Sequence, residues 1–370
     1  MPIRLIPALL CLLLAACAPN RNGDAEQAQP LKYASLLQME EADSFTLVTV
    51  ADAWHRGQTL ARYVLIPSGQ ALPTARPAGT VVRTPLKRAV VTSAVHAALL
   101  TDLGCSQRIA GLTDTAYIVS PAVKRLLHKG VRSMGTAMQP DIELIHASRA
   151  DGVLVSPFEN AGHGAIGRLG IPVIECADYM ETSPLGRAEW MRFYGRLFGE
   201  AERADSLFAR VESAYLTLRE KAKLSQSHPP TVMCDLLTGA TWYQPGGTST
   251  MGSLIADAGG HYLWADRPES GSLPLNLETV FARARNADIW LVKYGQSTAL
   301  TYRQMAADCP GYKQFRPWQR RHIFACNTLQ VPFYEEVPFH PDRLLASLIR
   351  IFNPEIKGMP HHVYYTPLAE

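Results

Sequence analysis

The sequence predicts an α/β protein with two lobes, each built on a mainly parallel β-sheet, that are joined by a single long α-helix. Three observations lead to this fold class. Short apolar strands alternate with short helices after about residue 88, as in βαβ units. These strand signals stop for roughly 50 residues of helical pattern and then resume. The two halves of the chain also repeat one local pattern, a capped helix followed by a strand.

The first residues have the features of a secretory signal. Arg4 precedes an apolar run at residues 5–14. About ten apolar residues are too few to cross roughly 30 Å of hydrocarbon, whereas a charged start and a short apolar core before small residues are typical of export. Leu14-Ala15-Ala16-Cys17 resembles the lipobox of bacterial lipoproteins, in which the cysteine becomes the lipidated first residue. We therefore expect a signal peptide at residues 1–16 and lipid on Cys17; the alternative is a secreted protein that is cut nearby.

Composition limits the partners of the exported chain. Residues 17–30 are polar and predict a flexible tether. The formal net charge is +3 and no run of lysine or arginine stands out, which argues against nucleic acid as a partner. No later segment is long and apolar enough for a transmembrane helix. We expect a periplasm-facing protein that meets the membrane only through its lipid anchor.

Five cysteines follow the expected lipidation site, namely Cys105, Cys176, Cys234, Cys309 and Cys326. No CxxC pair occurs, so zinc-ribbon and thioredoxin-like sites are excluded. Export permits a disulfide, but the number is odd and the spacings are wide. We expect buried free thiols.

The N-terminal lobe is expected at residues 31–185. Its first part, residues 31–88, is β-rich because apolar residues alternate between glycine and proline turns, and we assign this extension no role. Strands are expected at residues 89–92, 108–112, 153–155 and 171–174, and helices at residues 95–103 and 142–147.

The connecting helical segment is expected at residues 186–225, with a break near Gly199. Ser183 can cap its start with Pro184 at the first helical position. In its second half, apolar residues at three- and four-residue steps form one stripe: Ala204, Leu207, Phe208, Val211, Tyr215, Leu218 and Ala222. Such a helix, about 35 Å long, is either a strut between the lobes or an ordinary surface helix.

The C-terminal lobe is expected at residues 226–370 and contains the internal repeat. In the first lobe Asp141-Ile142-Glu143 opens a helix that leads to Asp151 and a strand. In the second, Asn276-Leu277-Glu278 opens a helix that leads to Asp288 and a strand. Two similar lobes on one long helix suit a protein that holds a ligand between them.

This organisation resembles the class III solute-binding proteins of ABC importers, the family of the iron-siderophore, haem and vitamin B12 receptors. The resemblance covers roughly residues 87–354 and implies two Rossmann-like lobes on one rigid helix, with the ligand in the cleft. It implies a monomer that docks on a permease dimer with its ATPase, using Glu143 on one lobe and Glu278 on the other. Residues 178–190 are similar to the lead-in of a Bacteroidetes-type lipoprotein subgroup. Both glutamates would also occur as ordinary helix-start residues, which the helix dipole favours.

No motif predicts catalysis. Residues 162–167 match GxGxxG, but a dinucleotide fingerprint needs its glycines directly after a strand and at the start of a substantial helix, and this segment has neither. No nucleophile elbow, Walker loop or HExxH pair occurs. We therefore expect no enzyme and no catalytic residues.

The eleven histidines are scattered and predict no metal site. His361 and His362 are adjacent, so in an extended chain they point apart. His96, Asp178 and Glu335 could in principle form one metal site. Such a site needs ligands that converge on the ion, and nothing in the sequence spacing of these three residues requires them to converge.

The cleft should be lined by loops at the carboxyl ends of the strands. The candidates are His96, Tyr117, Phe158, Tyr179, Trp242, Tyr243, Tyr294 and Tyr334. Aromatic walls suit a flat, conjugated or macrocyclic ligand, and the alternative for each residue is a place in the core.

The leading hypothesis is a receptor that captures a metal chelate, a ferric siderophore or haem, and has no cofactor of its own. Cobalamin is the alternative ligand within this class. Outside the class, an enzyme on the same scaffold would need a nucleophile with a nearby base, and a lipoprotein that binds another protein would need a large exposed apolar patch.

Overall fold

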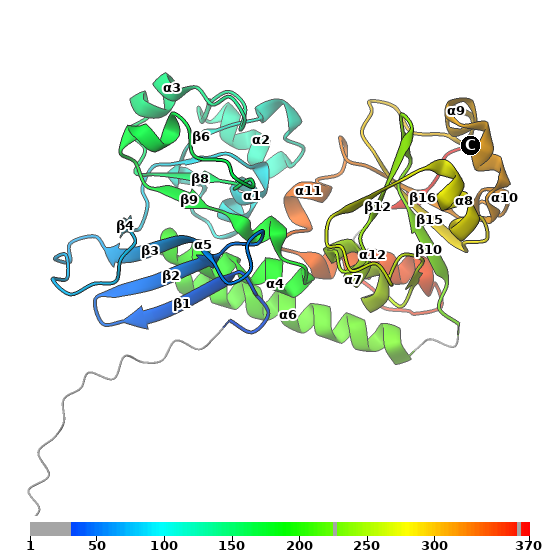
Figure 1. Ribbon diagram of the computed structural model, residues 1–370, viewed down its shortest axis with the longest axis horizontal. Helices are drawn as coiled ribbons and strands as arrows, with labels where there is room; N and C mark the ends of the chain where they lie inside the picture. The colour runs from blue at the N-terminus through cyan, green and yellow to red at the C-terminus, as the bar shows by residue number, and fades with distance from the viewer. Residues whose placement is uncertain (1–30, 225–227, 361–363) are drawn as a thin grey trace, which may run out of the picture.

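The computed structural model describes residues 31–224, 228–360 and 364–370 (Figure 1). The expected signal peptide, the tether with Cys17, and the pair His361 and His362 lie outside these residues. The described part is a mixed α/β fold with mainly parallel sheets and one long helix, so the predicted fold class is confirmed. No helix within it is long and apolar enough to cross a membrane.

One parallel sheet forms the core of what we call lobe one. Its order is β7-β6-β5-β8-β9, and every neighbouring pair is parallel. The central strand is wholly buried, as expected for an apolar strand covered on both faces. The strands are β5 (Ala89–Val91), β6 (Ile109–Leu112), β7 (Arg132–Ser133), β8 (Gly152–Val155) and β9 (Val173–Glu175). The helices are α1 (Ala94–Asp102), α2 (Pro121–His128) and α3 (Ile142–Ala147), with short 3-10 turns η1 (Ser106–Arg108), η2 (Thr115–Tyr117), η3 (Ile166–Leu169) and η4 (Ala177–Met180).

A second sheet, in the order β13-β10-β15-β16-β17, forms the core of lobe two. Only its last pair is antiparallel. Its strands are β10 (Thr231–Cys234), β13 (His261–Tyr262), β15 (Ile289–Tyr294), β16 (Ile323–Asn327) and β17 (Thr366–Pro367). A small antiparallel sheet holds β11 (Leu237–Thr238), β12 (Thr241–Pro245) and β14 (Ser272–Leu275). The helices are α7 (Thr250–Asp257), α8 (Leu277–Ala284), α9 (Tyr302–Asp308), η5 (Pro310–Gln314), α10 (Arg316–Gln319), α11 (Phe333–Glu336) and α12 (Pro341–Phe352).

The connecting segment consists of α4 (Pro184–Glu189), α5 (Met191–Leu197) and α6 (Ala201–Leu224). The expected break occurs at Gly199, whose φ of +65° lies in the left-handed region that glycine tolerates. In Figure 1, α6 runs beneath both lobes.

The apolar stripe of α6 belongs to two cores. All seven predicted stripe residues are buried. Ala204, Leu207, Phe208 and Val211 pack in the core of lobe one, whereas Tyr215, Leu218 and Ala222 pack in the core of lobe two. The helix is therefore a strut between the lobes, and the alternative of an ordinary surface helix is wrong.

The N-terminal extension is an integral part of lobe one. It forms a four-stranded sheet of β1 (Leu37–Ala42), β2 (Phe45–Ala51), β3 (Thr59–Pro67) and β4 (Thr80–Thr84). Its inward side chains share one apolar core with α5 and α6; Tyr63, for example, stacks on Phe193 with ring centroids 6.2 Å apart. The Tyr63 hydroxyl also accepts a hydrogen bond of 2.7 Å from the amide of Glu175, which ties β3 to the end of β9.

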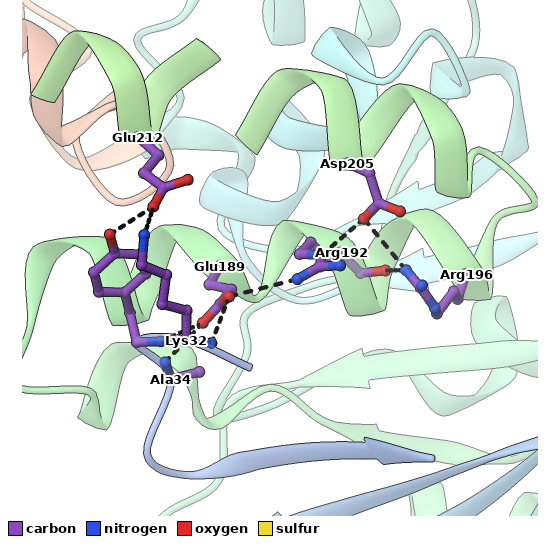
Figure 2. Close-up of polar contacts among 8 residues, drawn as sticks. Lys32, Ala34, Glu189, Arg192, Arg196, Asp205 and Glu212 are labelled. Atoms are coloured by element: carbon purple, nitrogen blue, oxygen red, sulfur yellow. Dashed lines mark hydrogen bonds and ion pairs between the residues drawn. The ribbon is translucent and has the colours of Figure 1, made fainter. Parts of the chain in front are cut away.

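Two buried carboxylates fasten the start of this extension. The amides of Lys32, Tyr33 and Ala34 donate to Glu189 at 2.8–2.9 Å (Figure 2). The next two amides, residues 35 and 36, donate to Glu181 at 2.9–3.0 Å. We call residues 32–36 with these two glutamates the amide clamp. Hydrogen bonds to a charged acceptor are stronger than neutral ones, so the clamp satisfies two carboxylates that burial would otherwise penalise.

The clamp explains why Gly186 and Trp190 occur in the segment before the long helix α6. Gly186 lies where a Cβ atom would approach the Tyr33 carbonyl oxygen to 2.8 Å, so only glycine fits there. The indole of Trp190 donates to Glu181 at 3.0 Å. Outside the clamp, Glu212 of α6 accepts hydrogen bonds from the side chains of Lys32 and Tyr33 (Figure 2).

The lobes also touch through α11. Glu335 is buried there and accepts hydrogen bonds of 2.9 and 2.7 Å from the amides of Val119 and Ser120 in lobe one. Close by, His340 Nε2 lies 2.9 Å from Asp102 Oδ2 of α1. The lobes are therefore joined by the α6 strut and by the hydrogen bonds between Glu335 and the loop that follows β6.

The five cysteines of the described chain are buried and unpaired, which confirms the prediction of free thiols. Burial raises the pKa of the Cys105 thiol to about 11 and that of Cys326 to about 12. These thiols stay protonated at neutral pH and behave as small apolar side chains.

Candidate functional site

Two pockets lie at the carboxyl ends of the parallel strands, where open α/β sheets bind ligands. The lobe-one pocket holds about 350 Å³ and is lined by parts of residues 137–142 and 155–166 and by Glu175. The lobe-two pocket holds about 590 Å³ and is lined by parts of residues 235–251 and 270–272, by Lys293 and Tyr294, and by Tyr334. Tyr334 neighbours Glu335, which contacts the loop after β6. The carboxyl edges of both sheets therefore lie on the sides where the lobes meet.

The lobe-one pocket lies between the ends of β8 and β9 and a glycine-rich loop. Asn160 and Gly164 bend this loop with φ values of +56° and +52°. Gly162 and Gly164 have open space where a Cβ would lie, so the loop has no close packing partner there. Most of the lining is apolar, and the side chains of Met138 and Phe158 are 75% and 52% exposed.

A histidine and a glutamate meet in this pocket. His163 Nε2, on the loop, lies 3.2 Å from Oε1 of Glu175, the last residue of β9. Glu175 Oε2 is buried and has no hydrogen-bond partner among the described residues. Burial raises the pKa of the Glu175 carboxyl to about 7 and lowers the pKa of His163, since a charged form loses hydration inside the protein. At neutral pH this pair can accept a hydrogen-bond donor or a cation.

The lobe-two pocket contains an ion pair that is already satisfied. Lys293 Nζ, on β15, lies 2.7 and 2.9 Å from the two carboxylate oxygens of Asp235. Asp235 follows β10 with a φ of +58°, a strained conformation for a residue with a side chain. Burial disfavours the charge on Lys293, but Asp235 outweighs this effect, so the pKa of Lys293 lies above its ordinary value.

Aromatic side chains surround this ion pair. Three predicted cleft residues, Tyr243, Tyr294 and Tyr334, line the lobe-two pocket. Phe158 is the predicted residue that lines the lobe-one pocket, and Tyr179 lies behind it, where its hydroxyl donates to the Pro157 carbonyl. Tyr117 is 73% exposed but lines neither pocket.

Two predicted cleft residues lie in the core instead. Trp242 is 0% exposed, and its indole donates to the Cys234 carbonyl at 2.9 Å. Trp242 and Tyr243 are neighbours on β12, and successive side chains of a strand point to opposite faces, so both could not face the pocket. The prediction for Trp242 is wrong for this reason.

His96 is the second correction, since it is 3% exposed. Its Nε2 lies 2.8 Å from Asp178 Oδ1 and 3.1 Å from the Tyr194 hydroxyl. Burial opposes the charge on Asp178, but His96 and Arg187 hold the pKa of its carboxyl below the ordinary value. This network joins α1 to η4 and α5. Glu335 takes no part in it, and no three His, Cys, Asp or Glu side chains of the described chain could together hold a metal ion.

The repeated unit places an aspartate in a similar position in both lobes. Asp151 accepts hydrogen bonds of 2.7 and 2.9 Å from the two amides just before β5, and Asp288 accepts one of 2.9 Å from Thr231 at the start of β10. In the helices that precede them, Glu143 and Glu278 are exposed in the first turn, next to the capping side chains of residues 141 and 276. The two glutamates therefore occupy matching, solvent-facing positions.

Sequence reasoning missed the two charged pairs at the pocket floors. Glu175 carried a signal, a carboxylate at the end of an apolar strand, but nothing in the sequence related it to His163. Asp235 likewise directly follows the strand of β10. Another hollow, of about 870 Å³, lies at the opposite edge of the lobe-two sheet, beside Asp288 and His322. It is remote from the strand ends that bind ligands in such folds.

Comparison with known proteins agrees with this architecture. The model of a family described as periplasmic binding protein matches residues 89–328. The chain belongs to that family. Two solved structures have the same class III fold. One is an ABC-type Fe³⁺-hydroxamate transport system protein from Saccharomonospora viridis, with a TM-score of 0.58 and 18% identity, and the match covers 73% of this chain and 94% of that one. The other is a periplasmic haem-binding protein from Pseudomonas aeruginosa, with a TM-score of 0.60 and 16% identity, and the match covers 77% of this chain and 99% of that one.

Two relatives by sequence are named as lipoproteins. An uncharacterised lipoprotein of Methanocaldococcus jannaschii is 24% identical over 298 residues, which cover 77% of this chain and 69% of that protein. A second lipoprotein of the same organism is 22% identical over 308 residues, 80% of this chain and 77% of that protein. The periplasmic binding proteins that it resembles are binding and transport components, consistent with an exported protein that binds a solute.

Proposed function

We propose that this periplasmic binding protein is the substrate-binding lipoprotein of an ABC importer. It captures an iron chelate, either a ferric siderophore or haem, between residues 31–185 and residues 226–370, and delivers it to the permease dimer with its ATPase. The observation that carries this proposal is the pair of pockets at the carboxyl edges of the two sheets, on the sides where the lobes meet. The protein acts as a monomer, performs no chemistry and has no resident cofactor.

The structural neighbours support the ligand class. One is named for Fe³⁺-hydroxamate transport and another for haem binding. Exposed aromatic and apolar side chains in both pockets, Phe158 in one and Tyr243 and Tyr334 in the other, supply contact area for the organic part of a chelate. Cobalamin, also a large chelate, is the alternative ligand.

The ligand class can be tested by thermal unfolding and absorbance with haemin, a ferric hydroxamate and cyanocobalamin. A ligand that binds only the folded protein stabilises it by mass action, by about 2.7 kcal/mol at a concentration 100 times its Kd. We expect an iron chelate to raise the Tm. A shift with cyanocobalamin alone would select the alternative ligand, and conversion of a chelate into product would contradict the binding role.

The membrane anchor is a separate part of the proposal. We propose that Cys17 is the lipidated first residue of the mature protein, which the names of both lipoprotein relatives support. Cys17→Ser should release the protein from the membrane fraction or leave an uncleaved precursor. A processed protein that begins elsewhere and carries no lipid mass would contradict this anchor.

A further inference from the structure

The lobe-one pocket contains a histidine next to a glutamate, and one oxygen of that glutamate has no hydrogen-bond partner among the described residues. The contact between His163 Nε2 and Glu175 Oε1 is 3.2 Å, and Glu175 Oε2 is buried without a partner. Buried polar groups in native proteins are nearly always hydrogen-bonded, so an exception needs an explanation. Elsewhere His340 has a carboxylate oxygen at 2.9 Å and Lys293 two, at 2.7 and 2.9 Å.

The spacing of His163 Nε2 and Glu175 Oε1 fits a shared metal ion. Imidazole nitrogen and carboxylate oxygen bind transition metals at about 2.1 Å. A metal at that distance from two atoms 3.2 Å apart would subtend an angle of about 100° between them, close to the angle of adjacent positions in octahedral or tetrahedral coordination. The two side chains can therefore fill adjacent coordination positions of one ion.

We propose that His163 and Glu175 together bind the metal ion of the captured chelate, each filling one of two adjacent positions that the chelate leaves open. This inference rests on the proposed function and narrows its ligand to an incompletely coordinating chelate. No third His, Cys, Asp or Glu of the described chain joins the pair, so the chelate supplies the other donor atoms. A hexadentate siderophore leaves no position open, and a planar macrocycle such as haem leaves open positions on opposite faces, which cannot accept both side chains.

The surroundings of the pair suit such a ligand. The glycine-rich loop at residues 162–167 places the imidazole of His163 next to Glu175, the last residue of β9. Met138 and Phe158 form an exposed apolar rim that can cover the organic part of the chelate. Carboxylate and imidazole together are a donor set that binds iron.

The test uses iron complexes that differ in open positions. Nitrilotriacetate binds ferric iron through four donor atoms and leaves two adjacent positions open, whereas ferrioxamine is saturated and haemin is planar. We expect the full chain to bind ferric nitrilotriacetate with a change in the electron paramagnetic resonance spectrum of the iron. His163→Ala and Glu175→Gln should each weaken this binding at least about tenfold and abolish the spectral change.

His55→Ala is the matched control. His55 Nδ1 lies 3.0 Å from Asp52 Oδ2 on the exposed extension, so this variant removes a histidine–carboxylate pair outside both pockets and should bind like the unchanged protein. A Tm within a few degrees of the unchanged protein shows that each variant is folded. Binding of ferric nitrilotriacetate that survives both pocket substitutions overturns this inference, as does a preference for ferrioxamine or haemin, and both leave the proposed function standing. Failure to bind any iron chelate overturns both.

Discussion

The two pockets differ in how their charged pairs are satisfied. In lobe two, Lys293 bonds to both oxygens of Asp235, and the pair is complete without a ligand. In lobe one, Glu175 has a histidine at 3.2 Å, and one of its oxygens has no partner in the part of the chain that the structure describes. The same edge of two similar sheets thus holds a finished ion pair in one lobe and an unfinished one in the other. The finished pair fixes the shape of its pocket, and the unfinished pair leaves free energy for a ligand to recover.

The largest expected effect is the pH dependence caused by Glu175. Its pKa of about 7 in the folded chain exceeds its ordinary 4.5, so the folded state binds the proton more tightly than the unfolded state. The associated stability is complete below pH 4.5 and is lost as the pH rises through about 7, a change of about 3 kcal/mol. Glu175→Gln should remove this loss. In urea unfolding of the metal-free protein, the free energy of unfolding of the variant should therefore rise relative to that of the unchanged protein between pH 5 and pH 8. Parallel pH profiles would contradict the unfinished state of this pair.

Breaking the finished pair should cost somewhat less. Asp235→Ala leaves Lys293 charged and half-buried and removes its two hydrogen bonds, which should lower the free energy of unfolding by about 2 kcal/mol. Asp235→Asn tolerates the left-handed backbone and keeps an acceptor, so it should cost less. Adding Lys293→Met to Asp235→Ala should recover part of the loss because no unpaired charge remains. Full additivity of the two substitutions would show that the pair is not coupled.

The smallest free-energy contribution per residue is expected at the matched glutamates, where the lobes are alike. Glu143 and Glu278 are exposed, and each should contribute about 1 kcal/mol to permease docking because such charges are solvated and screened. Charge reversal adds repulsion, so Glu143→Arg with Glu278→Arg should abolish uptake, while double alanine should only reduce it. Ligand affinity in solution should not change. Normal uptake by the double reversal, or loss of ligand binding, would remove these residues from the docking proposal.

Capping residues and the periodicity of apolar residues predicted the helices and strands that depend mainly on local sequence. Helix α3 was predicted to the residue, and the α6 stripe was recovered in full, because helix capping and buried apolar periodicity determine them. The short β-ladders around β11 and β14 were not predicted, since two to four residues carry too little pattern.

Long-range contacts account for what the sequence could not predict. The role of residues 31–88 depends on their packing against α5 and α6, more than 100 residues away in the chain. The burial of His96 depends on its contacts with Asp178 and Tyr194. The pairing of His163 with Glu175 depends on the fold of the loop at residues 162–167, whose sequence matches a dinucleotide fingerprint. In each case the residue types were visible, but the distances that give them a role arise only in the folded chain.

The amide clamp determines how mechanical load enters the molecule. A pull on the chain ahead of Leu31 acts on five backbone amides that are bonded to Glu181 and Glu189. These bonds share the load, and the two glutamates pass it to α4 and thus to the segment that joins the lobes. Strand β1, which follows the clamp, is shielded from peeling away from β2. We therefore expect a pull on the chain ahead of Leu31 to load α4 and the connecting segment before it separates β1 from β2.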